Sequence, residues 1–583
     1  MSLVVADREG AAGSAEANDL AAAALVRGLV GDGAAVVASP GSRNTALLLA
    51  FDACPEAELH VLLDERAAGF FALGLARESR RPVILCCTSG SAAGHYTPAV
   101  MEASESGVPL VVVTANRPPE RHHCGEAQTA PQAEMFAPWV RASRVLAVPD
   151  ETLDPRRVLA LAAALRAASL AGPVHLDVPM RKPLTRGTSA VVADAAPRIA
   201  IPHEASPATV AGLVARLRRA ERGVIVAGPM RPATVDPAAL RGAVQAMVRA
   251  TGWPVLADPA SGLRYGETAS CHYDLVLRHP AIAESLAPDV VLQLGGAPTS
   301  KATQQWLERH AAGKLVVLGH DLRYSDPGAL ASDVILGEPS ALLTAAAASL
   351  APSERGRAHA AAFRDAEARV RAVLADDRVG FQGDVARAAL RAVPRDGVLH
   401  VASSLAIRQL DAFGGPLPHP IAAHASRGVN GIDGTLATFL GEVLAARQPG
   451  VALLGDLAFL HDLDGLAAWA QHGVEAAGTA VVIDNRGGRI FELLPIAQQL
   501  DERRFERLFA TPQRLDIPAI ARGLGHRVAT PRDLDELRAA LAEEVLRPGL
   551  GVIHVTLDPA VDRAQQAVVL AAVQAALAAG GEA

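Results

Sequence analysis

Short apolar runs alternate with longer Ala- and Leu-rich stretches along most of the chain, and this alternation limits the choice of fold more than any other feature. The runs are 35–39, 60–64, 82–87, 109–114, 223–228, 290–295, 314–319, 397–402, 451–455, 479–483 and 551–556. Their length and apolar character suit buried strands, and the stretches between them favour helices. Strands that alternate with helices form parallel sheets with helices on both faces. The sequence therefore predicts an α/β protein of doubly wound parallel sheets.

The domain organisation follows from the length and from two breaks in this alternation. A chain of 583 residues is too long for a single hydrophobic core. The Ala-, Pro- and Ser-containing stretch 188–207 is typical of a linker, and an Ala- and Arg-rich helical region covers 340–375. We therefore expect three α/β domains, at 1–190, 191–350 and 351–583. The first and third are candidates for distant copies of one fold.

Composition narrows the class of ligand. The chain has 55 basic and 62 acidic residues, a net charge of −7 and only 3% aromatic residues. Without a basic run or an aromatic stacking platform, nucleic acid and anionic membrane surfaces are poor partners. The five cysteines are scattered and odd in number, which suits a reducing cytosol. No secretory signal or apolar span of membrane length is evident. We expect a cytoplasmic protein with a small-molecule ligand.

Two strand ends in the last third carry a pattern suited to a metal-bridged diphosphate. Gly455 allows a tight turn as one buried strand ends, and Asp456 offers an anionic oxygen. Further along, Asn485 offers an amide oxygen, and Gly487 and Gly488 let the backbone approach a ligand. Oxygen ligands of this kind suit Mg²⁺. Taken alone, the pair could also be two ordinary strand ends with Asp and Asn in turns.

At these residues the chain resembles the thiamine-diphosphate (ThDP) enzymes, whose signature is Gly-Asp-Gly followed by Asn-Asn. The chain departs from this signature at Leu457 and at Asp484. The resemblance implies ThDP with Mg²⁺ or Mn²⁺ as cofactors, and it implies Asp456, Asn485 and Gly487 as metal ligands. The first domain would then bind the aminopyrimidine ring and the third would bind the diphosphate and the metal. The implied cofactor-binding residues are Glu65, Ser404, Ile432, Gly455, Asp456, Leu457, Asn485, Gly487, Gly488 and Ile490.

Glu65 directly follows an apolar run and opens a helical stretch. Its plain explanation is a carboxylate favoured by the positive end of the helix dipole. The resemblance implies a second role, in which the carboxyl group bonds the aminopyrimidine ring of ThDP and exchanges a proton with it.

Further motifs narrow the resemblance to one family. They are Ser39-Pro-Gly-Ser-Arg43, Asp64-Glu-Arg66, Thr88-Ser-Gly90, Asn116-Arg-Pro-Pro-Glu120, Cys124-Gly125 with Gln128, Ser426-Arg-Gly428 with Gly431-Ile-Asp-Gly434, and Gly487-Gly-Arg-Ile-Phe491 with Leu494-Pro495. In order and spacing they resemble the 2-succinyl-5-enolpyruvyl-6-hydroxy-3-cyclohexene-1-carboxylate (SEPHCHC) synthases of menaquinone biosynthesis, the MenD family. The resemblance implies a transferase that decarboxylates 2-oxoglutarate and joins the succinyl semialdehyde unit to isochorismate. It also implies a homodimer or homotetramer with active sites at the dimer interface.

The chemistry of these substrates explains the basic residues in the motifs. The succinyl semialdehyde unit carries one carboxylate and isochorismate carries two, and Arg binds carboxylates in a bidentate manner. The resemblance implies Glu65, Ser404, Arg408 and Arg427 as catalytic residues. It implies Arg43, Arg117, Gln128, Lys301, Arg408, Arg427, Phe491 and Leu494 as substrate-binding residues. For any one basic residue, an ordinary surface ion pair is the alternative explanation.

Three residues depart from the family pattern: His95, Ala302 and Asn430. They weaken residue-level substrate assignments more than they weaken the reaction. Two other functions remain open, an acetolactate-synthase-like or other 2-oxoacid decarboxylase and a catalytically inactive binding subunit. The first shares the cofactor motifs but is not expected to carry the other motifs together. Retention of Glu65, Asp456 and Asn485 argues against the second.

Overall fold

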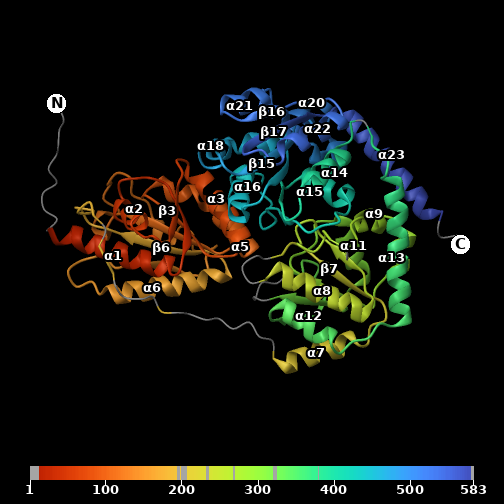
Figure 1. The fold of residues 1–583 in the computed structure, drawn as a ribbon, viewed down its shortest axis with the longest axis horizontal. Coiled ribbons are helices and arrows are strands. Elements are labelled where there is room, and N and C mark those ends of the chain that lie inside the picture. The colour runs from red at the N-terminus through yellow and green to blue at the C-terminus, as the bar shows by residue number, and fades with distance from the viewer. Residues whose placement is uncertain are drawn as a thin grey trace. The chain divides into compact units, whose positions relative to one another are not determined.

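The computed structural model describes residues 12–188, 190–192, 197, 206–230, 235–266, 269–319, 325–378 and 380–579. The chain divides into two compact units, Met1–Ile201 and Pro202–Ala583. The first unit contains one six-stranded sheet, and the second contains a five-stranded and a six-stranded sheet (Figure 1). Every strand pair is parallel, which confirms the predicted class of doubly wound parallel sheets.

The sheet of the first unit has the strand order β2-β1-β3-β4-β6-β5. Its strands are β1 (Ala34–Ala38), β2 (Ala57–Val61), β3 (Val83–Cys87), β4 (Leu110–Asn116), β5 (Ser143–Val145) and β6 (Val174–Pro179). Its helices are α1 (Ala12–Val30), α2 (Thr45–Asp52), α3 (Glu65–Ser79), α4 (Ser91–His95), α5 (Thr97–Ser106) and α6 (Pro155–Ala168), with 3-10 turns η1 (Pro119–Arg121), η2 (Gln132–Glu134) and η3 (Ser169–Ala171). Helices α1, α2 and α6 pack together over one face, and α3 packs with α5 and against β1 and β3 (Figure 1).

Burial explains which strands of this sheet the sequence predicts well. Every residue of the central strands β3 and β4 is buried, so these strands appear as continuous apolar runs. The edge strand β2 is half exposed, and it lies three residues earlier than the predicted run 60–64. Its register pairs Ala34 with Ala57 and Ala38 with Val61. Asp64 belongs instead to the connection to α3, because its side chain caps the helix by accepting from the Ala67 N–H at 2.8 Å.

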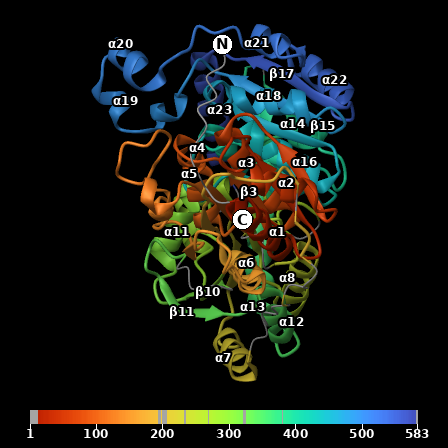
Figure 2. The same cartoon turned by 90° about the vertical axis from the view of Figure 1, so that its left-hand side faces the viewer.

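The five-stranded sheet of the second unit, here called the middle sheet, has the order β11-β10-β9-β7-β8, with β11 beside β10 at one edge (Figure 2). Its strands are β7 (Gly223–Ala227), β8 (Val255–Ala257), β9 (Val290–Leu294), β10 (Leu315–Gly319) and β11 (Ala331–Leu336). Its helices are α7 (Pro207–Leu217), α8 (Pro237–Thr251), α9 (Tyr273–Leu277), α10 (Pro280–Ser285), α11 (Lys301–His310), α12 (Pro339–Ala347) and α13 (Glu354–Val373). Helices α7, α8 and α12 share a core on one face of this sheet.

The third sheet has the order β13-β12-β14-β15-β17-β16, which repeats the order of the first sheet strand for strand. Its strands are β12 (Val398–Val401), β13 (Ala422–His424), β14 (Gly450–Gly455), β15 (Ala477–Asp484), β16 (Arg527–Ala529) and β17 (Gly549–Thr556). Its helices are α14 (Gln382–Ala392), α15 (Leu405–Gln409), α16 (Thr435–Ala446), α17 (Asp456–His461), α18 (Leu463–His472), α19 (Ile496–Gln499), α20 (Glu502–Phe505), α21 (Ile517–Gly523), α22 (Leu534–Glu544) and α23 (Pro559–Ala578), with π-turns η5 (Leu410–Gly414) and η7 (Glu506–Ala510) and the 3-10 turn η6 (Arg489–Leu493). The shared order supports the expectation that the first and third blocks have one fold.

The middle and third sheets share a hydrophobic core. Side chains of α9, α11 and α13 pack there with Phe381, Phe413 and Val569, which come from the segment before α14, from η5 and from α23. Helices α13 and α23 lie along each other (Figure 1). The second unit is therefore held together by a large apolar contact between its two sheets.

Several features were not foreseen from the pattern. The strands β5, β6, β8, β11, β13 and β16 have no counterpart among the predicted runs. All but β6 and β11 are three residues long, and β11 is largely exposed. The expected linker 188–207 falls largely outside the described residues. In the described part of the chain, no helix is long and apolar enough to cross a membrane.

Candidate active site

The polar residues singled out from the sequence lie where the strand order predicts a ligand site. In an open parallel sheet, ligands bind beyond the carboxyl ends of the strands where the strand order reverses. In the third sheet this point lies between β12 and β14. Ser404 comes shortly after β12, Asp456 directly follows β14, and Asn485 directly follows the neighbouring strand β15.

Asp456 is a buried carboxylate at the first position of α17, with 4% of its surface exposed. Its Oδ2 accepts a hydrogen bond of 2.7 Å from the Gly487 N–H, which joins the two strand ends directly. Burial, and then the negative charge of Asp484, raises the pKa of Asp456 to about 6. Hydrogen bonds from the Leu457 and Gly487 N–H groups oppose this shift but do not cancel it. A divalent cation would do so, and the residues present therefore fit a metal ion.

The structure requires glycine at position 487 but not at position 455. Gly487 has a φ of +104°, and a Cβ there would lie 2.0 Å from the Ala510 carbonyl oxygen, so only glycine fits. Gly455 has an extended backbone with φ −87° and ψ 167°, and the nearest atom to a Cβ would be 3.9 Å away. The expectation that Gly455 is needed for a tight turn is therefore wrong.

Two residues that the sequence reasoning missed orient Asn485. The Asn485 Nδ2 donates to the Gln382 Oε1 at 3.2 Å, which leaves the Asn485 Oδ1 for another partner. Gln382 is itself held by Asp562, whose carboxylate accepts from the Gln382 backbone N–H at 2.8 Å and from its side-chain amide. All three side chains are buried. A chain of this kind fixes the orientation of an amide ligand in the way that outer-shell groups do in metal sites.

The departure at Asp484 has a structural explanation. Its Oδ2 accepts from His554 Nε2 at 3.0 Å and its Oδ1 from the Arg486 N–H at 3.1 Å. The hydrogen bond with His554 lowers the pKa of Asp484. Asp484 thus stays ionised and bonded within the turn, where its charge acts on Asp456 from a distance.

Arg489 also holds this turn and was not assigned a role from the sequence. Its Nε donates to the Asn485 carbonyl oxygen at 3.1 Å, and its guanidinium binds Glu506 at 2.5 Å and Glu492 at 3.2 Å. Its position inside the Gly-Gly-Arg-Ile-Phe motif was the available signal.

Ser404, Arg408 and Arg427 gather beyond β12 and β13. Ser404 has φ +70° and ψ −131°, a conformation rarely adopted by a non-glycine residue and often stored at functional sites. Arg408 Nη1 donates to the Ser404 carbonyl oxygen at 2.6 Å. Partial desolvation and then the charge of Arg427 lower the pKa of Arg408, although Asp411 opposes the shift. The Arg408 side chain is exposed, so its guanidinium is accessible to an anionic ligand.

The apolar residues assigned to the site differ in exposure. Ile432, Ile490 and Phe491 are half-buried, and the Phe491 ring packs edge-on against Phe509 with a centroid distance of 5.6 Å. Leu494 is 48% exposed. Phe491 is thus anchored within the protein, whereas Leu494 presents an apolar surface outward.

In the first unit, Glu65 is the first residue of α3, as predicted. It is half-buried, and its charge contributes to raising the pKa values of Cys87 and Tyr96. Arg43 is 6% exposed and donates from Nη1 to the Met180 carbonyl oxygen at 3.1 Å. The Arg43 Nε has no hydrogen-bond partner among the described residues. A buried cation with a spare donor fits an anion.

Arg117 and Gln128 hold their own loop. Arg117 donates to the Ala127 carbonyl oxygen at 2.7 Å and lies 3.6 Å from Glu126. Gln128 has a φ of +59° and donates to the Ser89 carbonyl oxygen at 3.0 Å. These two side chains thus shape the segment that follows β4 and join it to the turn after β3.

The turn after β3 is also held by a buried hydrogen-bond network that sequence reasoning missed. Gln132 accepts from the Gly90 N–H at 2.9 Å and donates to the Ala115 carbonyl oxygen at 3.1 Å. Asp177 accepts from the Asn116 side chain at 2.7 Å, and burial raises the pKa of Asp177. An acidic residue inside the apolar strand β6 was the available signal.

The remaining assigned residues are placed as follows. Lys301 is the exposed first residue of α11 in the middle sheet, followed by the buried Ala302. His95 ends α4 and is exposed. Asn430 has a φ of +59°, a left-handed conformation that Asn tolerates better than most residues. Leu457 is half-buried beside Asp456 in α17.

The described residues contain no group of three or more His, Cys, Asp and Glu side chains that could hold a metal ion. The candidate metal ligands Asp456, Asn485 and Gly487 offer one carboxylate, one amide oxygen and one backbone carbonyl. A metal ion there would need further oxygens from a bound ligand, such as a diphosphate.

Comparison with known families agrees with this geometry. The family described as "Thiamine pyrophosphate enzyme, N-terminal TPP binding domain" matches residues 20–137. "Middle domain of thiamine pyrophosphate" matches residues 203–375, and "Thiamine pyrophosphate enzyme, C-terminal TPP binding domain" matches residues 418–555. The SEPHCHC synthase of Geobacillus kaustophilus is 38% identical over 565 residues, which cover 93% of this chain and 95% of that protein.

The chain belongs to the SEPHCHC synthase family.

A second member of the family, from Myxococcus xanthus, is 37% identical over 577 residues, with 93% of this chain and 95% of that protein covered. The chain is therefore an enzyme, a ThDP-dependent transferase. Among solved structures, benzoylformate decarboxylase from Polynucleobacter necessarius superposes with a TM-score of 0.69 at 17% identity, covering 93% of this chain and 98% of that one. At that identity the likeness supports the fold alone.

Proposed function

We propose that the enzyme decarboxylates 2-oxoglutarate and joins the resulting succinyl semialdehyde unit to isochorismate, giving SEPHCHC and CO₂ in menaquinone biosynthesis. Membership of the SEPHCHC synthase family supports this reaction. The structural observation that carries the proposal is Arg43, whose guanidinium is buried with 6% of the residue exposed and whose Nε has no hydrogen-bond partner among the described residues. A cation placed in this way suits a reaction whose two substrates both bring carboxylates.

We propose ThDP with Mg²⁺ or Mn²⁺ as the cofactors. When bound, ThDP supplies a nucleophilic carbon and an electron sink for the loss of CO₂. Asp456, the Asn485 Oδ1 and the Gly487 backbone would hold the metal, with diphosphate oxygens completing its coordination. Gly455, Leu457 and Gly488 would line the diphosphate, and Ile432 and Ile490 would contact the cofactor. The buried Asp456, whose pKa is raised to about 6, and the oriented amide of Asn485 support this assignment.

In the proposed active site, Glu65 would exchange a proton with the aminopyrimidine ring when ThDP is bound, and the basic residues would bind the substrate carboxylates. Arg43, Arg117, Lys301, Arg408 and Arg427 are the candidate carboxylate ligands. Arg43 is supported by its buried guanidinium with a spare donor. Arg117 is in part engaged by its own loop, so its contribution to the substrate is expected to be smaller.

Four other residues complete the proposed substrate pocket. Gln128 would offer a polar contact, and the Ser404 hydroxyl would lie beside the reacting atoms on its strained turn. Phe491 and Leu494 would form the apolar wall, which excludes water from the charged groups.

We propose that two copies of the chain form the minimal active assembly, with each active site between them. Glu65 belongs to the first unit, whereas Asp456 and Asn485 belong to the second. A tetramer of such dimers is compatible with the symmetry of most oligomers.

A turnover assay tests the proposal against its alternatives. The protein is incubated with ThDP, Mg²⁺, 2-oxoglutarate and isochorismate, and isochorismate loss and CO₂ release are followed together. Equal loss and release support the proposal. CO₂ release without isochorismate loss would indicate a simple 2-oxoacid decarboxylase. In a parallel incubation with pyruvate as the only 2-oxoacid, consumption of pyruvate would indicate an acetolactate-synthase-like enzyme. No turnover in either incubation would indicate an inactive binding subunit.

A further inference from the structure

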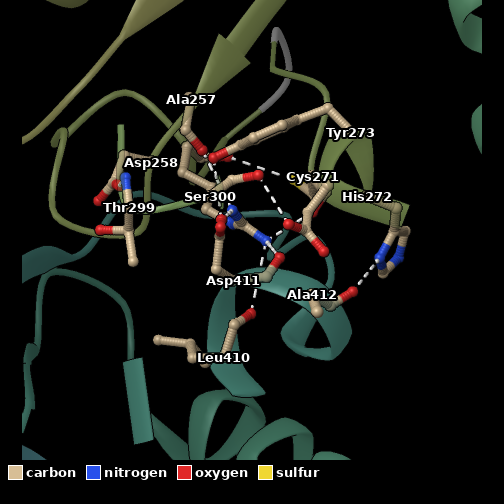
Figure 3. A network of polar contacts seen from close by, with 12 residues as sticks. Ala257, Asp258, Cys271, His272, Tyr273, Thr299, Ser300, Leu410, Asp411 and Ala412 are labelled. Carbon is tan, nitrogen blue, oxygen red and sulfur yellow. Dashed lines mark hydrogen bonds and ion pairs between the residues drawn. The ribbon is translucent and has the colours of Figure 1, made fainter. Parts of the chain in front are cut away.

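A network of buried polar groups crosses the contact between the middle and third sheets (Figure 3). At its centre Arg264, from the segment between β8 and α9, forms an ion pair with Asp411 of η5 at 2.7 Å. The two side chains are 0% and 2% exposed. Tyr273, the first residue of α9, donates its hydroxyl to the same Asp411 oxygen at 2.9 Å. Arg264, Tyr273 and Asp411 are here called the buried bridge.

The Arg264 guanidinium donates hydrogen bonds to backbone carbonyl oxygens on both sides of this contact. Towards the middle sheet it donates to the carbonyl oxygens of Ala257 at 3.1 Å and Cys271 at 2.5 Å. Towards the third sheet it donates to the carbonyl oxygens of Asp411 at 2.6 Å and Leu410 at 3.5 Å. Because the guanidinium is planar, these bonds define an orientation as well as a distance.

On the third-sheet side, the buried bridge binds η5, which directly follows α15, the helix that carries Arg408. The π-turn η5 begins immediately after α15, and Arg408 lies three positions before Asp411. π-turns are rare and are frequent at functional sites. Since α15 has only five residues, holding Leu410 and Asp411 determines the direction of the whole helix.

On the middle-sheet side, the buried bridge leads to Lys301. Asp274 follows Tyr273 in α9 and accepts from the Ser300 hydroxyl at 2.6 Å. Ser300 in turn caps α11 by accepting from the Thr303 N–H at 3.0 Å, and Lys301 is the first residue of that helix. Asp258, after β8, accepts from the Thr299 N–H at 2.8 Å and holds the same segment from the other side.

We propose that the buried bridge sets the separation and orientation of Lys301 and Arg408, so that Arg264, Asp411 and Tyr273 are positioning residues for the carboxylates of the substrates. This inference rests on the proposed function, because that function makes Lys301 and Arg408 carboxylate ligands. Affinity for a rigid anion depends on ligands that are placed before binding.

Stability alone is a weak explanation for the buried bridge. The two sheets already share an apolar core, and a buried ion pair is often replaced by apolar residues without loss of stability. Burial also raises the pKa of Asp411 to about 7, although Arg264 opposes the shift. Burying these charges costs free energy, whereas the many directional hydrogen bonds fix the orientation of the bonded segments. Orientation of these segments is therefore the better explanation for the buried bridge.

Kinetics of three variants test this role: Arg264→Met, Asp411→Asn and Tyr273→Phe. For Arg264→Met we expect the KM of at least one substrate to rise five-fold or more, with the Kd for ThDP changed less than two-fold. Tyr273→Phe should show the same pattern with a smaller rise, and it tests the bridge even if Arg264→Met does not fold. Arg77→Met is the matched control, because Arg77 and Glu102 form a buried ion pair in the first unit at 3.4 Å. It should lower Tm and leave both KM values unchanged.

A double-mutant cycle separates positioning from plain stability. In an Arg408→Ala background, Arg264→Met should raise KM less than two-fold further, since the separation between Lys301 and Arg408 that the bridge sets no longer exists. Equal effects of Arg264→Met in both backgrounds, or unchanged KM values in all three bridge variants, would overturn the inference. Hydrogen exchange of residues 404–410 gives a readout independent of turnover, and faster exchange in Arg264→Met is expected. If the wild-type enzyme does not consume isochorismate, the proposed function fails, while unchanged exchange would overturn the bridge.

Discussion

The first and third sheets have the same strand order and yet carry different chemistry at their carboxyl edges. In the third sheet, the residue after the third strand is Asp456, a buried carboxylate whose pKa is raised to about 6 by burial and then by the charge of Asp484. In the first sheet, the equivalent strand β3 leads into a turn at Gly90, whose N–H is held by Gln132. The comparison teaches that topology decides where a ligand binds, whereas the side chains at the strand ends decide which part of a ligand each sheet can hold.

The largest expected effect separates the two sheets by function. Glu65→Gln in the first sheet should reduce turnover by about 10²–10⁴, since that is what loss of a proton-transfer group costs, and should leave ThDP binding intact. Asp456→Ala in the third sheet should instead weaken metal-dependent ThDP binding. Turnover and ThDP titration of both variants check this. Equal loss of ThDP from both would break the division of roles between the sheets.

The basic residues of the two sheets should act on substrates and not on the cofactor. Ala at Arg43, Arg408 or Arg427 should raise the KM for 2-oxoglutarate or isochorismate ten-fold or more, since an unmatched buried charge costs about 2–5 kcal/mol. Arg117→Ala should act less, because its guanidinium is shared with its own loop. Each substrate is titrated separately, with Arg538→Ala, an exposed residue paired with Asp377, as control. Unchanged constants in all four variants would show ordinary surface charges.

In the third sheet, the residue that orients the candidate metal ligand Asn485 can be tested separately. Gln382→Met removes the acceptor that orients the Asn485 amide, and Mg²⁺ affinity in the presence of ThDP should fall about 10–100-fold, as for other outer-shell groups. The measurement is a calorimetric Mg²⁺ titration. Gln132→Met, the matched change in the first sheet, should leave Mg²⁺ affinity unaltered. A similar loss in both variants would assign the effect to general stability.

Two glycines in the third sheet should differ in their structural importance. Gly487→Ala forces a left-handed conformation and a contact with the Ala510 carbonyl, so it should destabilise the protein by about 1–3 kcal/mol. Gly455→Ala should leave apo stability within about 1 kcal/mol, because its backbone is extended, and should affect only ThDP affinity. Denaturant unfolding of the apo proteins measures the free energy of unfolding of both variants and tests this difference. Equal destabilisation would contradict the different roles assigned to these glycines.

The smallest expected effect concerns acid stability of the first sheet. Burial lowers the pKa of His175 to about 4, below the ordinary value of 6.5. Between these values the unfolded chain binds a proton that the folded chain does not, so stability should fall as pH decreases through this range. Unfolding at pH 7, 5 and 4 measures this slope, which His175→Gln should reduce. His123→Gln, at an exposed histidine, should keep the wild-type slope.

Much of the fold could be predicted because buried parallel strands are local apolar runs. β3, β4, β14 and β15 were recognised for this reason, whereas three-residue strands such as β5 and β16 leave no periodic trace. The edge strand β2 was displaced by three residues, since half exposure removes the contrast between strand and connection.

The residues proposed for the site were accessible from sequence because they occur in contiguous motifs at strand ends. Asp456 and Gly487 were among them, and the structure joins them by a hydrogen bond. The family and the class of reaction were identifiable on the same basis, and the comparisons confirm them.

By itself, the sequence determined the fold class, the family and the candidate ligands, because each depends on residues near one another along the chain. Only the tertiary structure decided how these ligands are held. Gln382 lies 103 positions from Asn485, and Arg264 lies 147 positions from Asp411. No local pattern records such pairs, because a buried hydrogen bond requires only that two partners meet in space.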